Sequence, residues 1–376
     1  MNQLSASPRH TTLFQTFALC TCILAFCLCA SARQPTIVTF DPPGSILTTV
    51  YQINPSGTIV GWYQDAGGVY HAFLRAPSGK ITSYDAPGAG KGPFQGTSFV
   101  SINPSGELVG QTLDSNNAFH VFLLTHQGFT KFDAPDAGTG AGQGTYGWSI
   151  NPRGEIAGAY VNAGDGHQGT QVWHSYVRAA DGTVTEYDAP GGGTGPGQGT
   201  EPCLNDCLNP VGTVAGDYID STNVFHGFVR SRQGDIVEFD PPGASNGTYP
   251  SGIVPNGDVV GTYADANGVY HGFLRDTHGR STDINVPGAG TGSGQGTFVN
   301  SIADNGAISG AYADANGAYH GFARTPEGKI TKFDVPGAGT GAGQGTAVLG
   351  SNISSGAVAG SYIDGNNVQH GFLWIP

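Results

Sequence analysis

Histidine is the residue type whose spacing in this chain most directly suggests chemistry. Seven histidines, each followed two residues later by an aromatic residue, recur at intervals of 45 to 54 residues. Imidazole is a common metal ligand and acid–base group near neutral pH. Seven equivalent positions on seven separate repeats cannot share one ion, so we expect each histidine to hydrogen-bond a neighbouring carbonyl or carboxylate and to fix its own repeat. The seven are His71, His120, His174, His226, His271, His320 and His370.

Aspartates in a repeated turn suggest calcium binding. Carboxylate, amide and backbone oxygens are the ligands that Ca²⁺ prefers. Each turn supplies one carboxylate, however, and an aspartate that caps its own turn explains the position without an ion. Calcium therefore stands as an alternative to turn capping, and no other cofactor is indicated. The positions are Asp65, Asp114, Asp220, Asp265, Asp314 and Asp364, with Asn162 in the third copy.

The third and fourth copies break the pattern of the others and mark a candidate ligand site. Fourteen residues separate the repeat histidine of the third copy from the preceding tyrosine, against eight in the fifth copy. The longer segment carries His167, Gln168 and Trp173, and Glu201 opens the next copy. A specific contact would explain these departures, and so would drift in a tolerant loop. No catalytic residue is indicated, because near-identical units do not display the unlike residues that converge in an active site.

Cys203 and Cys207 are the two cysteines outside the N-terminal segment. An even number of cysteines in an exported chain favours a disulfide between them. Two thiols are too few for a metal site, and their spacing is not that of a C-x-x-C redox pair. Their insertion follows Glu201, so we expect it on the same face as the longer hairpin of the third copy.

Each copy must position these residues on short strands. Its four segments are rich in β-branched and aromatic residues and end in Asn, Asp, Gly or Pro, as strands do. Asn-Pro-x-Gly after the first segment suits a type I turn, and Asp-x-Asn-Gly after the second suits a tight hairpin. A glycine within the second strand marks a close approach by another group. The copy therefore reads as a four-stranded antiparallel meander, with a flexible glycine-rich crossing to the next.

Four-stranded units repeating about every 50 residues are typical of a β-propeller. The segment 36–41 reads as a fourth strand without the first three, and 370–374 reads as a third strand without a fourth. Pairing of the two would close the ring and leave no free edge. We therefore predict an all-β, seven-bladed propeller of four-stranded antiparallel blades, closed by the N-terminal strand. The predicted blades are 46–85, 94–133, 144–188, 199–240, 247–283, 296–334 and 345–374 with 36–41.

Composition and the first residues indicate an exported protein. Only 11% of residues are charged, against about 25% in average proteins. The chain therefore has few residues from which helices with a charged face could form. The net charge of −13 argues against nucleic acid and anionic membranes as partners. Arg9, an apolar run over 13–28 and small residues at 30–32 form a secretory signal, and the run is shorter than the roughly 20 residues of a membrane span.

We accordingly predict a signal peptide at 1–32 and a single propeller at 33–376. The mature protein is expected in the periplasm, on the cell surface or in the medium, as a monomer without membrane contact beyond the signal segment. A retained signal that anchors the chain is the alternative.

The triplet His71-Ala72-Phe73, with Asn54, Gly57 and Gly61 upstream, resembles the bacterial extracellular repeat proteins named for their HAF triplet. The resemblance covers all seven copies, although most of them read His-Gly-Phe. It implies an exported β-repeat protein. It implies no activity and no site residues.

These observations favour a binding or scaffold module that recognises extracellular carbohydrate or another cell-surface polymer. Exposed aromatic residues beside Asn, Asp and Gln would do the recognising, and repeated weak sites gain about 10² to 10⁴-fold in avidity on a repeating ligand. The alternatives are a polysaccharide hydrolase or lyase of propeller type and a purely structural surface protein. Six glutamates in the whole chain argue against the enzyme.

Overall fold

The computed structural model describes residues 35–164, 171–204, 206–347 and 355–376. The predicted signal peptide at 1–32 and the candidate residues His167 and Gln168 lie outside the described residues. The described part of the chain forms twenty-eight β-strands and no helix, so the all-β prediction is confirmed. It accordingly contains no helix with the length and hydropathy of a membrane span.

The strands recur in the same order in the seven copies of the repeat, which we call units one to seven. The first strands are β2 (Ser45–Ile53), β6 (Gly96–Ile102), β10 (Gly144–Ile150), β14 (Gly199–Pro202), β18 (Thr248–Ile253), β22 (Gly296–Ile302) and β26 (Gly345–Ala347). The second strands are β3 (Ile59–Asp65), β7 (Leu108–Leu113), β11 (Ile156–Val161), β15 (Val214–Ile219), β19 (Val259–Ala264), β23 (Ile308–Ala313) and β27 (Val358–Ile363). The third strands are β4 (Tyr70–Arg75), β8 (Phe119–Thr125), β12 (His174–Arg178), β16 (Phe225–Arg230), β20 (Tyr270–Arg275), β24 (Tyr319–Arg324) and β28 (Gln369–Ile375). The fourth strands are β5 (Ile81–Tyr84), β9 (Gly128–Phe132), β13 (Val184–Tyr187), β17 (Ile236–Phe239), β21 (Ser281–Ile284) and β25 (Ile330–Phe333), and β1 (Thr36–Phe40) precedes unit one.

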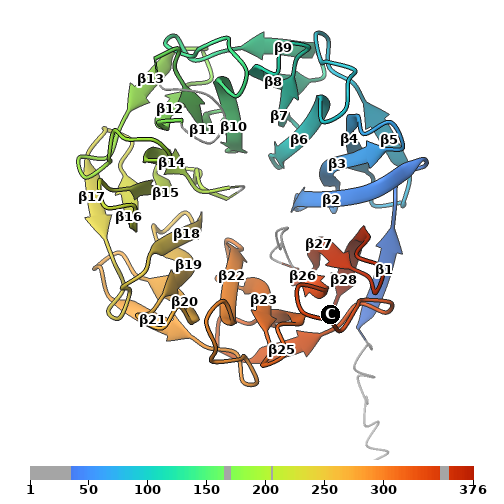
Figure 1. Cartoon of the computed structure of the whole chain (residues 1–376), viewed down its shortest axis with the longest axis vertical. Coiled ribbons are helices and arrows are strands. Elements are labelled where there is room, and N and C mark those ends of the chain that lie inside the picture. Colours follow the sequence, from blue (N-terminus) through green and yellow to red (C-terminus); the bar gives the residue numbers. More distant parts are fainter. Residues whose placement is uncertain (1–34, 165–170, 205, 348–354) are drawn as a thin grey trace, which may run out of the picture. The chain divides into compact units, whose positions relative to one another are not determined.

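Consecutive strands within a unit pair antiparallel, and Figure 1 shows the first strands nearest the common centre. Unit four forms a separate four-stranded sheet, whereas units one to three and units five to seven with β1 form two twelve-stranded sheets. Sheet boundaries therefore differ from the predicted separate blades. The reason is that one parallel bridge joins neighbouring units where each of four crossings ends. These bridges pair Tyr70 with Gly96, Phe119 with Gly144, Tyr270 with Gly296, and Tyr319 with Gly345.

The two ends of the described chain lie side by side (Figure 1). Strand β1 pairs antiparallel with β28 from Thr36↔Ile375 to Phe40↔Gly371, so β1 takes the fourth-strand position of unit seven. The first strand of unit one also contacts unit seven, because the Val50 N–H donates to the Ser361 hydroxyl at 3.0 Å.

In the described part of the chain the hydrophobic core forms seven clusters, and each cluster is shared by two adjacent units. Val60 and Ala72 of unit one, for example, pack with Phe99 and Phe122 of unit two. The aromatic residue two positions after each repeat histidine is fully buried, at 0–3% exposure. These residues are Phe73, Phe122, Tyr176, Phe228, Phe273, Phe322 and Phe372.

Glycine in each second strand allows this packing. A Cβ atom at Gly61 would overlap the carbonyl oxygen of Thr49 and would lie 3.0 Å from the Phe73 ring. The close approach predicted from the in-strand glycine is thereby confirmed, since a larger residue at Gly61 would collide with the first strand and with the aromatic ring.

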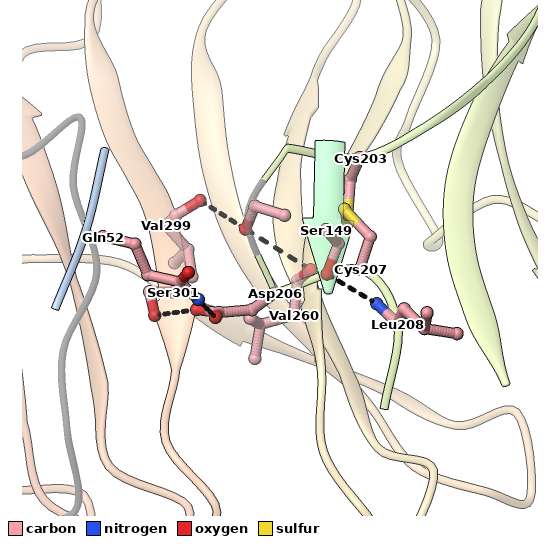
Figure 2. Close-up of a disulfide and its surroundings, with 10 residues drawn as sticks. Gln52, Ser149, Cys203, Asp206, Cys207, Leu208, Val260, Val299 and Ser301 are labelled. Carbon is pink, nitrogen blue, oxygen red and sulfur yellow. Dashed lines mark hydrogen bonds between the residues drawn. A yellow bond between two sulfur atoms is a disulfide. The ribbon is translucent and has the colours of Figure 1, made fainter. Parts of the chain in front are cut away.

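The insertion in unit four holds a disulfide between Cys203 and Cys207, as predicted. Figure 2 shows that it projects Asp206 toward the first strands of other units. The Asp206 carboxylate accepts hydrogen bonds from Gln52 Nε2 of unit one at 2.8 Å and from the Ser301 hydroxyl of unit six at 2.6 Å. Burial raises the pKa of Asp206 to about 6, and the hydrogen bonds from Ser301 and Gln52 oppose that rise.

The backbone of the insertion binds two further units. The N–H of Ile253 in unit five donates to the Asp206 carbonyl at 2.9 Å. Figure 2 shows the second bond, in which the Leu208 N–H donates to the Ser149 hydroxyl of unit three at 3.3 Å. Units one, three, five and six are therefore tied to one short loop of unit four.

This loop lies at the end of the strands where the Asn-Pro turns gather. Asp206 and Leu208 line a cavity of about 120 Å³ together with Asn54, Asn103 and Asn151 of those turns. The prediction that the insertion shares a face with the longer hairpin of unit three is wrong. A first strand runs from the crossing to the first turn, so an insertion after β14 must lie at the far end from the crossings.

Replacement of an in-strand glycine tests the shared core. We expect Gly310→Ala to lower the free energy of unfolding by about 1–3 kcal/mol, because its Cβ would overlap the Phe298 carbonyl oxygen and crowd Phe322. Gly365→Ala is the control, since a Cβ there meets no atom within 4 Å. Equilibrium urea unfolding measures both. Equal losses in the two variants would contradict the packing argument.

Candidate functional site

Each repeat histidine contacts acidic or amide side chains of its own unit, and in unit seven one partner is Asp41, which directly follows β1. His71 Nδ1 lies 2.7 Å from Asp85 Oδ1, and its Nε2 lies 3.4 Å from Asp65 Oδ2. The ring stacks on Tyr63 with centroids 5.0 Å apart, and a tyrosine does the same in five other units. The structural role predicted for these histidines is confirmed. The other Nδ1 partners are Asp133, Asp188, Asp240, Asn285, Asp334 and Asp41.

The aspartates considered as calcium ligands cap their own turns. Asp265 Oδ1 accepts the N–H groups of Asn267 at 2.8 Å and Val269 at 2.9 Å, and its Oδ2 lies 3.6 Å from His271 Nε2. The Val269 N–H is the main cause that lowers the pKa of the Asp265 carboxyl. Within the described ranges, no group of three or more His, Cys, Asp or Glu residues is placed to hold a metal ion. The same capping pair occurs at Asp65, Asp114, Asp220, Asp314 and Asp364.

The glycine-rich crossings, predicted to be flexible paths, carry a repeated set of hydrogen bonds. In the crossing from unit one to unit two, Gln95 Oε1 accepts the Gly92 N–H at 3.0 Å. Gln95 Nε2 donates to Asn117 in the second hairpin of unit two, at 3.0 Å. The Phe94 N–H donates to the Gly68 carbonyl in the second hairpin of unit one, at 2.8 Å. The crossing thus joins the second hairpins of two units at one end of the strands, which we call the crossing end.

Half-buried aromatic side chains gather at the crossing end in a set that we call the aromatic belt. Phe119 and Tyr146 approach with ring centroids 4.3 Å apart, and Tyr146 also contacts Trp173 at 4.9 Å. Another run joins units four to six, with centroid distances from 4.7 to 6.4 Å. The belt comprises Trp62, Tyr70, Phe119, Tyr146, Trp173, Phe225, Tyr249, Tyr270, Phe298 and Tyr319, of which only Tyr146 is fully buried.

Two carboxyl groups interrupt the belt. Glu201 on β14 and Asp217 on β15 are directly opposite in the antiparallel register, where side chains lie on one face about 4.5–5.5 Å apart at Cβ. Both keep some exposed surface, yet protein atoms surround them on most sides. Burial raises the pKa of Glu201 to about 7, and burial followed by the charge of Glu201 raises the pKa of Asp217 well above its usual value.

The charges of this pair act on two tyrosines of the belt. After burial, the charge of Glu201 contributes to the raised pKa of Tyr146 in unit three. The charge of Asp217 contributes to the raised pKa of Tyr249 in unit five, after burial and Tyr270. Two carboxyls with raised pKa values in one place can hold one proton between them near neutral pH, which is what acid–base chemistry or binding of a cationic group requires.

Two of the four residues predicted to bind a ligand lie within the described part of the chain. Trp173 and Glu201 lie at the same end, because Trp173 bridges to Gly199, and the Thr200 N–H donates to the Trp173 carbonyl at 2.8 Å. Sequence analysis missed Asp217, although a signal was present. Asp217 follows the in-strand glycine, and it is the one acidic residue at a position that holds Trp62, Gln111, Ala159, Thr262, Ala311 and Ser361 in the other units.

The sequence matches no protein-family model and no curated protein. Among solved structures, a streptogramin B lyase is similar at 15% identity and a TM-score of 0.56, over 90% of this chain and 97% of that one. Virginiamycin B lyase from Staphylococcus aureus is similar at 15% identity and a TM-score of 0.55, over 91% and 100%. A puromycin hydrolase is similar at 15% and 0.51, over 86% and 52%. At this identity the likeness shows the fold alone, which is of the β-propeller type.

The raised pKa values predict how stability depends on pH. The folded chain binds protons at Glu201 more tightly than the unfolded chain does, so this carboxyl costs stability as pH rises from about 4.5 to about 7. We expect Glu201→Gln to raise the free energy of unfolding at pH 8 by about 1–3 kcal/mol and to leave it unchanged at pH 4.

Urea unfolding from pH 4 to pH 8 provides the measurement. Glu327→Gln is the matched control, because Glu327 is exposed and its pKa is lowered by a hydrogen bond from Thr325. Parallel stability profiles of Glu201→Gln and the unchanged protein would refute the burial argument.

Proposed function

We propose that the mature chain is an exported, seven-bladed β-propeller in which each unit is one blade. Three observations support this proposal. Each unit carries antiparallel strands in the same order, each core cluster is shared by neighbouring units, and β1 completes unit seven. The signal-like N-terminal segment, the disulfide and the resemblance to HAF-repeat proteins support export.

We further propose that the protein is a binding module for extracellular carbohydrate or a related surface polymer. The aromatic belt is the observation that carries this proposal. Sugar rings present faces of C–H groups that stack on aromatic rings, and their hydroxyls need nearby polar partners. A belt of half-exposed rings contributed by six units offers several such contacts to one polymer, and several weak contacts gain by avidity.

A second candidate function is hydrolysis or elimination on a polysaccharide, and the Glu201–Asp217 pair is the observation that favours it. Of two coupled carboxyls, one can stay protonated as a general acid while the other is ionised as a base. Burial and mutual repulsion supply that difference here. The pair lies within the aromatic belt, where a bound polymer would pass.

A glycan and cell-wall-polymer array tests binding by residues 33–376, with Ca²⁺ and again with EDTA. We expect selective binding that survives EDTA, because Oδ1 of each hairpin aspartate already accepts two backbone N–H groups. Tyr270→Ala should weaken binding by about threefold to tenfold, the worth of one aromatic contact. Val237→Ala, at an exposed residue of β17 on the outer side, is the control.

Each outcome of the array decides between the functions. Binding that is lost in EDTA would identify the hairpin aspartates as calcium ligands. Shortening of a bound polymer that stops in Glu201→Gln would establish the enzyme. Absence of binding to every polymer would contradict the recognition proposal and leave the structural role.

A further inference from the structure

Gln111 carries a buried polar atom that the fold does not use. Its side-chain oxygen Oε1 has no hydrogen-bond partner among the described residues. Buried polar side-chain atoms are nearly always paired, so an unpaired one calls for an explanation such as a ligand or a water molecule. Gln111 lies on β7 directly opposite Ser98 on β6, at the crossing end of unit two.

The corresponding positions in other units show that the fold does not need a glutamine here. Thr262 accepts the Val299 N–H at 3.0 Å, and Ser361 accepts the Val50 N–H at 3.0 Å, so each side chain ties its unit to the next one. Unit three has Ala159 at this position and unit six has Ala311. A small residue therefore suffices, and the amide of Gln111 is additional to the packing.

The residue lines an aromatic cavity of about 170 Å³. Trp62 and Tyr70 of unit one form one wall, with ring centroids 4.7 Å apart, and Phe119 of unit two lines it as well. Tyr51 lines the cavity beside Trp62, and the Trp62 indole opposes the rise that burial causes in the pKa of Tyr51. These side chains remain partly exposed, so the cavity is accessible at the crossing end.

The chemistry of the walls restricts the ligand. Among the described residues, the lining contains aromatic rings, the Gln111 amide and the Ser98 hydroxyl, and no Asp, Glu, Lys, Arg or His. A charged group would lose its hydration in this cavity without gaining an opposite charge. A small neutral ligand with an apolar face and at least one hydrogen-bond donor fits these walls.

We propose that this cavity is a subsite for a single neutral sugar ring, which stacks on Trp62 and donates a hydroxyl or amide hydrogen to Gln111 Oε1. The inference rests on the proposed function and makes it more specific. It assigns the primary contact to units one and two, rather than to units three and four. It also specifies the ligand class, which is uncharged pyranoses rather than uronic acids or protonated amino sugars. One aromatic stack with one or two hydrogen bonds corresponds to a dissociation constant on the order of millimolar for a free monosaccharide.

Titration of residues 33–376 with monosaccharides tests the subsite. The probes are glucose, galactose, mannose and N-acetylglucosamine, compared with glucuronic acid and glucosamine. Tryptophan fluorescence and saturation-transfer NMR report binding, and the best neutral sugar is then compared with its deoxy analogues. We expect a neutral sugar to bind and the charged sugars to bind at least tenfold more weakly.

Two variants at the cavity and one elsewhere in the belt locate the contact. Trp62→Ala and Gln111→Leu should each weaken binding of the neutral sugar at least tenfold, while Phe298→Ala, in the belt but outside the cavity, should leave it unchanged. Deoxygenation at the position that donates to Gln111 should weaken binding to the unchanged protein and should have no further effect on Gln111→Leu. An unchanged thermal unfolding midpoint shows that each variant is folded.

Several results would overturn the inference. Neutral sugars that bind equally well to Gln111→Leu, or a preference for the charged sugars, would refute the assigned contact. A crystal soaked with the sugar that shows only a water molecule beside Gln111 would do the same. If polymers bind on the array while Trp62→Ala binds them normally, the proposed function stands and the subsite fails. If no polymer and no monosaccharide binds, both fail.

Discussion

The structure depends on the sharing of each hydrophobic cluster between two adjacent units. Among the described residues no cluster belongs to one unit, so a single unit has no core of its own there that could stabilise it alone. The third-strand aromatic residue fills each junction, and it fits because the second strand has a glycine at the point of closest approach. The same requirement explains the pairing of β1 with β28, since Ile37 and Phe40 complete clusters on the two sides of unit seven. Packing thereby fixes the residue types at the repeated positions.

Positions whose residue type is not determined by core packing are available for ligand contacts. The residue after the in-strand glycine and the residue before the repeat histidine reach the crossing end. The first position varies most among the units, whereas the second is aromatic in six of the seven. Trp62, Gln111 and Asp217 all occupy the first of these positions, which therefore carries an indole, an amide and a carboxyl in three different units. The ordered crossings hold this end in place, because their glutamines bond to the hairpins of neighbouring units. Seven similar units therefore produce an end surface whose side-chain chemistry changes from one unit to the next.

Much of the frame could be predicted from sequence because it rests on local patterns. Strand periodicity, turn residues and the recurring histidine indicated four strands per copy, and the unmatched segments at the two ends indicated that they pair. The disulfide followed from the number of cysteines. What could not be predicted required the direction of a strand in space or the meeting of residues from several units. The insertion at Cys203 was assigned to the wrong end for the first reason. Asp217 and the cavity beside Gln111 were missed for the second, since nothing in a local pattern shows that Trp62 and Phe119 line one space.

The neutral cavity and the acidic pair are separated by a short path of aromatic contacts. Phe119 lines the cavity and packs on Tyr146, and the charge of Glu201 acts on the Tyr146 hydroxyl. A polymer with one ring on Trp62 would therefore pass over Phe119 and Tyr146 before it reached the carboxyls. In this arrangement the sugar ring that the protein recognises and the sugar ring next to any cleaved bond are different rings of one polymer. Burial disfavours the charged state of the two carboxyls. Binding energy gained at the uncharged cavity can nevertheless hold a polymer against them. The cavity and the acidic pair, the two unusual features of the belt, are then explained by one extended ligand.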